Sequence, residues 1–433
     1  MSKSTKFVRG FESICLHGGY LPDATTSRGV PLYRTAPYVF DSSEKAASLF
    51  GLKELGNIYS RLMNPTQDVL EKRFSMMEGA AASLAVSSGT AAAFYSVINV
   101  AEQGDNIISA RNLYGGTYTQ FNDILPKFGI TTKFVDICDP KKVTAAIDDK
   151  TKAIFCETVS NPAMEITPLE EISALAKEHN LPLIVDDTFT TPYLCKPIED
   201  WGANVVVHSL TKWSGGHGTG IGGIVADGAN FDWAGSGRHS LYTEEDTSYG
   251  GLRWGMDLPE ELSPVAFILR MRTVPLRNLG SCLSPDNSWM FLQGIETLPL
   301  RMERHCENAL KVAQYLKDHP KVEWVRYPGL EDDVEYEKNL KYLKGKGGSL
   351  VVFEVKGGAE AGKKFIDSLQ LLSHVANVGD AKSLAINPST TTHSQMNEDQ
   401  QRLAGITPGL VRLSIGIESI DDIIADIQEA LDQ

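Results

Sequence analysis

Several features of membrane, secreted and metal-binding proteins are missing from this sequence. No apolar run approaches the roughly 18 residues that a membrane span needs, and the opening residues 1–6 are not followed by the apolar core of a signal peptide. The six cysteines are scattered without a C-x-x-C pair, which argues against both a disulfide framework and a zinc site. We therefore expect a soluble, cytoplasmic protein with reduced thiols and no bound metal.

A basic patch is missing as well. Lys and Arg total 41 against 55 Asp and Glu, which gives a formal net charge of −14. Because nucleic acids and anionic membranes attract clustered basic side chains, this balance argues against both as partners. Of the 433 residues, 42% are hydrophobic and 22% charged, so the chain is long and apolar enough to bury the cores of two or three domains.

Between about residues 80 and 225, short apolar segments alternate with helix-prone segments. This alternation is typical of a parallel sheet with helices packed on it. Polar residues collect just past the strand ends, where ligands bind in open α/β sheets. The predicted strands are 83–86, 106–110, 132–136, 153–157, 181–185 and 205–207.

The chain divides into three predicted parts. Residues 1–60 are irregular and rich in Gly, Pro and Tyr, as expected of an arm that contacts a neighbouring subunit. Residues 61–285 form a large domain, and its last part, 226–285, is a long connection that its aromatic residues predict to be ordered. Residues 286–433 form a smaller C-terminal α/β domain. Its predicted elements include strands at 349–355 and 410–415 and a helix from Ser419 with one apolar face.

Lys212 stands at the end of the apolar strand 205–207 and its short polar extension. A primary amine in this position can condense with an aldehyde. Asp186 ends the preceding strand, at a separation that allows one crossover between parallel strands. Pyridoxal 5′-phosphate (PLP) requires such a pair, because the lysine holds its aldehyde carbon while the carboxylate keeps its pyridine nitrogen protonated. Either segment alone is more often structural, as a surface lysine or a helix cap, but together they favour a PLP site.

A phosphate site is predicted beside this pair. Residues 88–90 form a strand-to-helix turn, where free backbone N–H groups and the positive end of the helix dipole attract anions. Gly89 permits close approach of the backbone, while Arg61 would add a charge-assisted fork. Tyr114 would stack on the pyridine ring, and Asn161 would donate a hydrogen bond to the phenolic oxygen of the cofactor. The hydroxyls of Ser209 and Thr211, two residues apart on an extended chain, point the same way.

These segments together resemble the cysteine/methionine-metabolism family of PLP-dependent enzymes, over nearly the whole chain. The resemblance implies the α/β architecture of the fold-type I transferases, with a mostly parallel sheet, helices on both faces and a smaller C-terminal α/β domain. It also implies a homotetramer built from catalytic dimers. The matching stretches are 59–61, 64–66, 87–91, 113–117, 157–158, 161–162, 185–189, 209–212 and 411–416.

The resemblance also implies roles for individual residues. Lys212, Tyr114 and Asp186 would be catalytic. Arg412 would hold the α-carboxylate of the substrate, because its planar fork matches a carboxylate, with help from Asn161, Tyr59 and the Ser383 backbone. Tyr59 and Arg61 would reach the phosphate of the neighbouring subunit. The implied cofactor-binding set is Tyr59, Arg61, Ser88, Gly89, Thr90, Tyr114, Asn161, Asp186, Thr188, Ser209, Thr211 and Lys212. Asp187 departs from the usual Asn, which leaves open which of the two carboxylates pairs with the pyridine.

Within the family the sulfhydrylase branch fits best. The 226–285 connection is longer than the lyases carry, and Gly116 stands where methionine γ-lyases typically have cysteine. The implied reaction is γ-replacement on O-acetylhomoserine, in which sulfide or a thiol displaces acetate to give homocysteine or methionine.

Other functions stay open at this point. An O-succinylhomoserine-dependent synthase or a γ-lyase would use the same groups. The glycine-rich run 215–223 resembles the glycine loop of a dinucleotide-binding oxidoreductase, yet it leads into another predicted strand, 224–226, instead of opening a helix. A cofactor-free binding scaffold is a third class, and it would need no lysine at position 212. The acyl group and the sulfur donor are not specified by the sequence.

Overall fold

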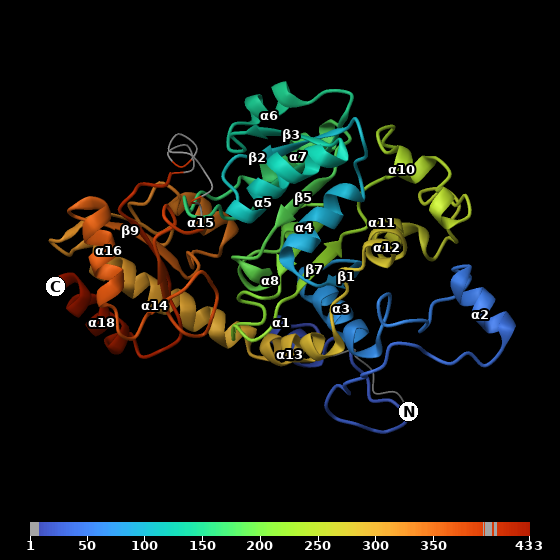
Figure 1. Ribbon diagram of the computed structural model, residues 1–433, viewed down its shortest axis with the longest axis horizontal. Helices are drawn as coiled ribbons and strands as arrows, with labels where there is room; N and C mark the ends of the chain where they lie inside the picture. The colour runs from blue at the N-terminus through green and yellow to red at the C-terminus, as the bar shows by residue number, and fades with distance from the viewer. Residues whose placement is uncertain (1–7, 393, 395–400, 402–404) are drawn as a thin grey trace.

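The structure is a computed structural model that describes residues 8–392, 394, 401 and 405–433, so residues 1–7 of the predicted arm lie outside it. Figure 1 shows two α/β bodies side by side, with the N-terminal three quarters of the chain around one sheet and the C-terminal quarter around another. Among the described residues, no helix has both the length and the apolar character needed to cross a bilayer.

The large sheet has seven strands in the order β1-β7-β6-β5-β4-β2-β3. Five strands, β6, β5, β4, β2 and β3, run parallel to one another. Strand β7 is antiparallel to both β1 and β6. The predicted α/β class with a mostly parallel sheet is therefore confirmed. The bounds are β1 (Ala82–Val86), β2 (Asn106–Ala110), β3 (Thr131–Val135), β4 (Thr151–Glu157), β5 (Leu183–Asp186), β6 (Val205–Ser209) and β7 (Gly223–Asp227).

Helices that alternate with these strands pack against the sheet, and their ends follow local sequence signals. Asn64 caps α3 by accepting a hydrogen bond from the Thr66 N–H, Pro65 occupies the first turn, and Gly79 ends the helix at φ 68°. The bounds are α3 (Pro65–Glu78), α4 (Gly89–Ile98), α5 (Gly115–Thr119), the π-helix η2 (Gln120–Ile124), the 3₁₀ turn η3 (Leu125–Phe128), α6 (Pro140–Ala146), α7 (Leu169–Glu178), α8 (Thr191–Leu194) and α9 (Pro197–Trp201).

The N-terminal segment contains two helices. Helix α1 (Phe11–His17) packs on α3 of its own chain and buries Cys15. Helix α2 (Ser43–Phe50) lies at the end of a long excursion from the body of the molecule (Figure 1). There the Tyr249 hydroxyl donates a hydrogen bond to the Phe50 carbonyl.

The 226–285 connection is built of short helical segments around an aromatic core. Trp233 stacks on Tyr242 and on Phe267, with ring centroids 4.6 and 5.1 Å apart. All three rings are buried and belong to the core of the large domain, so this long segment is anchored to that core. The bounds are α10 (Ser240–Thr243), η4 (Thr247–Tyr249), η5 (Ser263–Val265), α11 (Ala266–Met271), the π-helix η6 (Arg272–Leu276) and α12 (Arg277–Leu279).

The C-terminal body has a five-stranded sheet in the order β10-β11-β12-β9-β8, antiparallel except for β10 beside β11. Its strands β9 and β12 and helix α18 coincide with the predicted 349–355 and 410–415 strands and the predicted last helix. The bounds are β8 (Val322–Arg326), β9 (Leu350–Val355), β10 (Ser373–His374), β11 (Leu384–Ile386), β12 (Leu410–Ser414), α15 (Tyr336–Tyr342), α16 (Gly358–Ser368) and α18 (Ile420–Asp432).

Two helices connect the bodies. Helix α13 (Pro285–Glu296) begins at the predicted boundary near residue 286 but packs on α3, and its Phe291 and Ile295 belong to the core of the large domain. Helix α14 (Leu298–Lys317) contributes Met302 to that core and Val312 to the C-terminal core. One continuous helix therefore belongs to both hydrophobic cores.

Candidate active site

A pocket of about 300 Å³ lies where β4, β5 and β6 end, facing the C-terminal body. It brings together most of the residues predicted from the sequence, although they come from distant parts of the chain. The predicted residues that line it are Ser88, Gly89, Thr90, Tyr114, Asn161, Asp186, Thr188, Ser209, Thr211, Lys212 and Arg412.

Lys212 projects into this pocket from the loop after β6. Its Nζ donates a hydrogen bond to Asn377 Oδ1 over 2.6 Å. Burial, and then the charge of Arg412, lower the pKa of Lys212 to about 8. An amine with this pKa has a substantial unprotonated fraction near neutral pH, and that is the form that condenses with an aldehyde or accepts a proton.

Arg301 of α14 holds the backbone next to Lys212. Its guanidinium donates to the carbonyls of Trp213 (2.7 Å), Ser214 (3.2 Å) and Gly294 (2.7 Å). A Cβ at Gly216 would lie 2.1 Å from Arg301 Nη1, at a φ of +71°, so this position admits only glycine. Arg301 thus fixes the loop that carries the lysine.

The same face of α14 also holds the end of β12. His305 Nδ1 donates to the Ile415 carbonyl over 2.6 Å, and Asn308 Nδ2 donates to the carbonyls of Gly416 and Glu418. Because β12 carries Arg412, one helix positions the strand of the arginine as well as the loop of the lysine.

Asp186 is the carboxylate that faces the pocket. Its Oδ1 accepts hydrogen bonds from the Thr188 N–H (3.0 Å) and hydroxyl (2.6 Å), and the Thr188 oxygen accepts in turn from the Ser209 N–H over 2.8 Å. Burial raises the pKa of Asp186, and the two Thr188 bonds oppose the rise. A pyridinium N–H against this carboxylate would favour its anionic form.

Asp187 does not line the pocket, so we expect Asp186 to be the carboxylate that pairs with the pyridine nitrogen. Successive side chains of a strand point to opposite faces, and Asp187 follows directly on Asp186. Its carboxyl group is fully buried and accepts hydrogen bonds from the hydroxyls of Thr158 and Thr190.

Glu157 lines the pocket although it was not among the predicted site residues. It ends β4 in register with Asp186 of β5, and its Oε1 accepts a hydrogen bond from the Tyr114 N–H over 2.6 Å. Burial, and then the neighbouring Asp186, raise its pKa well above the ordinary value of a glutamate. Glu157 therefore fixes the backbone of the predicted stacking tyrosine.

The phosphate end of the pocket is formed by the start of α4. The Ser88 hydroxyl caps this helix by accepting from the Ala91 N–H, which leaves the first backbone N–H groups directed at the pocket. A Cβ at Gly89 would lie only 2.6 Å from Ser209 Cβ, so glycine is needed here for close packing of the two segments. The Thr211 hydroxyl lies beside them and bonds to the backbone of Gly222.

Arg412 reaches the opposite end of the pocket from β12. It is fully buried, its Nη1 donates to Asn161 Oδ1 over 2.9 Å, and its Nη2 donates to the Asn377 carbonyl over 3.4 Å. Within the described part of the chain, Nε has no hydrogen-bond partner and no carboxylate forms an ion pair with the guanidinium. Burial lowers its pKa to about 10. A buried guanidinium without an anionic partner suits a carboxylate ligand.

Three predicted residues lie outside the pocket. Ser383 is buried outside the pocket, and its N–H and hydroxyl both donate to Glu418, so its role in substrate binding stays a prediction. Asn377, which the sequence did not single out, occupies the place beside Arg412 instead. Tyr59 and Arg61 lie outside the pocket of their own chain, and the Arg61 guanidinium carbon is 5.2 Å from the centroid of the Tyr59 ring. Their contact with the phosphate in a neighbouring subunit stays a prediction.

The residues fit PLP by their chemistry. The pocket offers a lysine of lowered pKa, a buried carboxylate held by Thr188, helix-terminal N–H groups beside a required glycine, and a half-exposed tyrosine ring at Tyr114. These are the groups that bind an aldehyde, a pyridine nitrogen, a phosphate and an aromatic ring, respectively.

Comparison with known proteins agrees with this chemistry. Residues 12–432 match the family described as Cys/Met metabolism PLP-dependent enzyme. An O-acetyl-L-homoserine sulfhydrylase of Leptospira meyeri is 52% identical over 426 residues, covering 97% of this chain and 96% of its own. O-acetyl-L-homoserine sulfhydrylase 1 of Thermus thermophilus is 49% identical over 424 residues, covering 97% and 99%.

A solved structure is similar throughout. It is the crystal structure of a putative O-acetylhomoserine (thiol)-lyase from Campylobacter jejuni, with a TM-score of 0.94 and 42% identity, covering 98% of this chain and all of that one. That protein carries an N′-pyridoxyl-lysine-5′-monophosphate residue.

Proposed function

The chain belongs to the Cys/Met metabolism PLP-dependent enzyme family, and on this premise we propose that it is an O-acetylhomoserine sulfhydrylase. It would exchange the acetate of O-acetylhomoserine for sulfide or a thiol and release homocysteine or methionine. The observation that carries the proposal is the pairing of Lys212 with Arg412 in one pocket, because the pair supplies a base and an anchor for an amino acid. The sulfhydrylase names of the most similar relatives support the choice of substrate.

The chemistry divides between the cofactor and the protein. PLP, when bound, supplies the electron sink that stabilises negative charge on the substrate carbon. Lys212, displaced by the substrate amine, would take the α-proton and return a proton later, since a pKa of about 8 suits both tasks. Asp186 would hold a proton on the pyridine nitrogen, and Glu157 would keep the Tyr114 backbone in place.

Arg412 would orient the substrate through its α-carboxylate. Asn161 and Asn377 hold the guanidinium from two sides, so its planar fork is fixed before substrate arrives. Holding the carboxylate at Arg412 would orient the rest of the substrate relative to Lys212 in the same pocket.

Gly116 supports replacement over simple elimination. A Cβ there would lie 2.6 Å from the Tyr114 ring, so any side chain at this position would displace the ring. The cysteine typical of methionine γ-lyases at this place would therefore require the half-exposed Tyr114 ring to shift.

We also propose a homotetramer of catalytic dimers in the cytoplasm. Tyr59 and Arg61 lie outside their own pocket, and the Tyr59 side chain is 41% exposed, as expected if both reach a partner's site. The six thiols are all unpaired, which suits a reducing compartment.

Product analysis tests the reaction. With O-acetylhomoserine and saturating sulfide, homocysteine and acetate should form in equal amounts, and 2-oxobutyrate from elimination should be minor. O-succinylhomoserine should be turned over much more slowly under the same conditions. Dominant 2-oxobutyrate, or efficient cleavage of methionine, would identify a γ-lyase instead, and a preference for the succinyl ester would identify the other synthase.

A further inference from the structure

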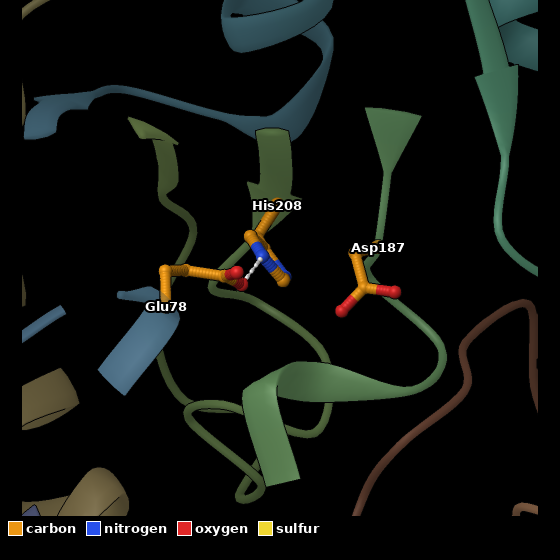
Figure 2. Close-up of side chains that lie close together, drawn as sticks. All are labelled: Glu78, Asp187 and His208. Carbon is orange, nitrogen blue, oxygen red and sulfur yellow. Dashed lines mark hydrogen bonds and ion pairs between the residues drawn. The ribbon is translucent and has the colours of Figure 1, made fainter. Parts of the chain in front are cut away.

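Three ionisable side chains are buried together directly behind the cofactor pocket. Glu78 ends α3, Asp187 follows β5, and His208 lies in β6, and all three have no exposed surface. One oxygen or nitrogen of each lies within 4.8 Å of the others. Figure 2 shows His208 between the two carboxyl groups, with one carboxyl oxygen of Asp187 directed towards it.

The hydrogen bonds within this group are incomplete. His208 Nε2 lies 2.6 Å from Glu78 Oε1. Both hydroxyl donors to Asp187, from Thr158 and Thr190, bond to the same oxygen, Oδ1. Within the described residues, Asp187 Oδ2, Glu78 Oε2 and His208 Nδ1 have no hydrogen-bond partner. A bare carboxylate oxygen in a dry interior is unfavourable, whereas an un-ionised acid carries its proton there.

Among the described residues, no lysine or arginine forms an ion pair with Asp187, and of the groups that face it only His208 can carry a positive charge. The ionisable groups that face it are Glu78 from α3, His208 from β6, its neighbour Asp186, and Cys195 after α8. Among the described residues, the only ion-pair partner of Glu78 is His208. The lysine and acids that face Glu78 from α9 are Lys196, Glu199 and Asp200, and Lys196 pairs with Glu199.

Burial, like the absence of a lysine or arginine ion pair, favours the un-ionised form of the two carboxyl groups. It raises the pKa of the Asp187 and Glu78 carboxyls well above their ordinary values and lowers the pKa of His208. A carboxylic acid also has the shape and the net charge of the asparagine amide that the family resemblance leads one to expect at this position.

We propose that Asp187 is a positioning residue that works as an un-ionised acid, holding the turn that presents Asp186 to the cofactor. The Thr158 hydroxyl, directly after β4, and the Thr190 hydroxyl, in the turn itself, both donate to Asp187 Oδ1. These two hydrogen bonds hold the turn against the end of β4. With Asp187 neutral, Asp186 alone of the two adjacent aspartates carries a charge for the pyridine nitrogen. The inference rests on the proposed function because Asp186 is there the partner of the cofactor.

Infrared difference spectroscopy reads the protonation state directly. The holoenzyme spectrum minus that of Asp187→Asn at neutral pH should show the carbonyl band of an un-ionised acid, which shifts in heavy water. The matched control is Asp149→Asn, because Asp149 is exposed and should give carboxylate bands. Carboxylate bands from Asp187 as well would overturn the proposal.

The pH dependence of stability gives a second, independent reading. Asp187 with a raised folded pKa binds a proton that the unfolded chain releases above about pH 4. Between pH 5 and the folded pKa, wild type should therefore lose stability relative to Asp187→Asn, about tenfold per pH unit in the unfolding constant. Both holoenzymes are unfolded by denaturant in the same excess of PLP. For Asp149→Asn, the difference in stability from wild type should stay constant with pH. If the difference between wild type and Asp187→Asn is also constant, or favours wild type as pH rises, Asp187 is not an un-ionised acid.

The positioning role is tested by cofactor affinity. Asp187→Asn keeps the oxygen acceptor and should retain the wild-type cofactor absorbance and its pH titration. Asp187→Leu removes the acceptor and should weaken PLP binding at least tenfold. If the leucine variant does not fold, the double variant Thr158→Val and Thr190→Val removes the same two bonds and should show the same loss. Wild-type affinity without these bonds would contradict the role. None of these measurements depends on turnover of a substrate. Failure of the proposed activity would therefore appear only in the product analysis, and failure of this inference only in these experiments.

Discussion

Replacement of Arg412 by leucine removes a buried guanidinium that lines the pocket. The side chain is held by Asn161 and Asn377, and its Nε has no partner in the described residues, so its hydrogen bonds to a substrate carboxylate would be made without reorganisation. Truncating one partner of such a buried, hydrogen-bonded pair costs about 2–5 kcal/mol, because the other charge stays buried and unpaired. This corresponds to a loss of about 30- to 5,000-fold in kcat/KM.

The assay compares Arg412→Leu with Arg412→Lys as a matched control. Lysine keeps the charge but not the planar fork, so its loss should be intermediate. In both variants the absorbance of bound PLP should be retained, because Arg412 contacts the substrate end of the pocket. If the leucine variant turns over O-acetylhomoserine within threefold of wild type, the carboxylate binds elsewhere and the reasoning is wrong. If the leucine variant loses the cofactor instead, Arg412 contributes to the binding of PLP.

Three further predictions concern the cofactor. The rate at which the apoenzyme takes up PLP covalently should rise about tenfold per pH unit and level off near pH 8, because the unprotonated amine of Lys212 is the reacting form; levelling near pH 10 would contradict the lowered pKa. Gly89→Ala should weaken PLP binding at least tenfold by pushing the backbone away from Ser209, whereas Gly29→Ala, with open space around it, should not. Mixing inactive Arg61→Ala subunits with inactive Lys212→Ala subunits should restore activity, and proven subunit exchange without recovery would place Arg61 and the lysine in one chain's own site.

Much of the fold was predictable because most strands of the large sheet are short, continuous and buried. The segment 205–207 has no polar interruption, and β6 buries it on both faces, as parallel strands in the middle of a sheet are. The antiparallel direction of β7 was not predictable, since strand direction depends on the length and path of the connection and leaves no mark in the pattern of apolar residues.

The site was predictable where the chemistry is tied to a strand end. Lys212 and Asp186 both follow apolar runs, and the parallel sheet brings those ends together. Glu157 was missed because its place beside Asp186 depends on the register of β4 and β5, which no local pattern fixes. Asn377 was missed, and Ser383 was chosen although it lies outside the pocket, because the segment between β10 and β11 has no periodicity from which to tell a lining residue from a buried one.

The alternation of side chains along a strand would have separated Asp186 from Asp187. Adjacent residues at a strand end point to opposite faces, so only one of two consecutive aspartates can face a ligand. Which of them does so depends on the face that the neighbouring helices leave open, and the sequence does not state that.

Helix α14 makes the two bodies a single mechanical unit. Its 20 residues extend for about 30 Å, and they contribute to both hydrophobic cores without an intervening hinge. Arg301 fixes the lysine loop at one end, while Asn308 holds the end of the arginine strand further along. Rotation of one body against the other would therefore break bonds at both ends of the pocket. On heating, the two cores should melt in one cooperative transition instead of two, since neither can unfold without taking the shared helix from the other.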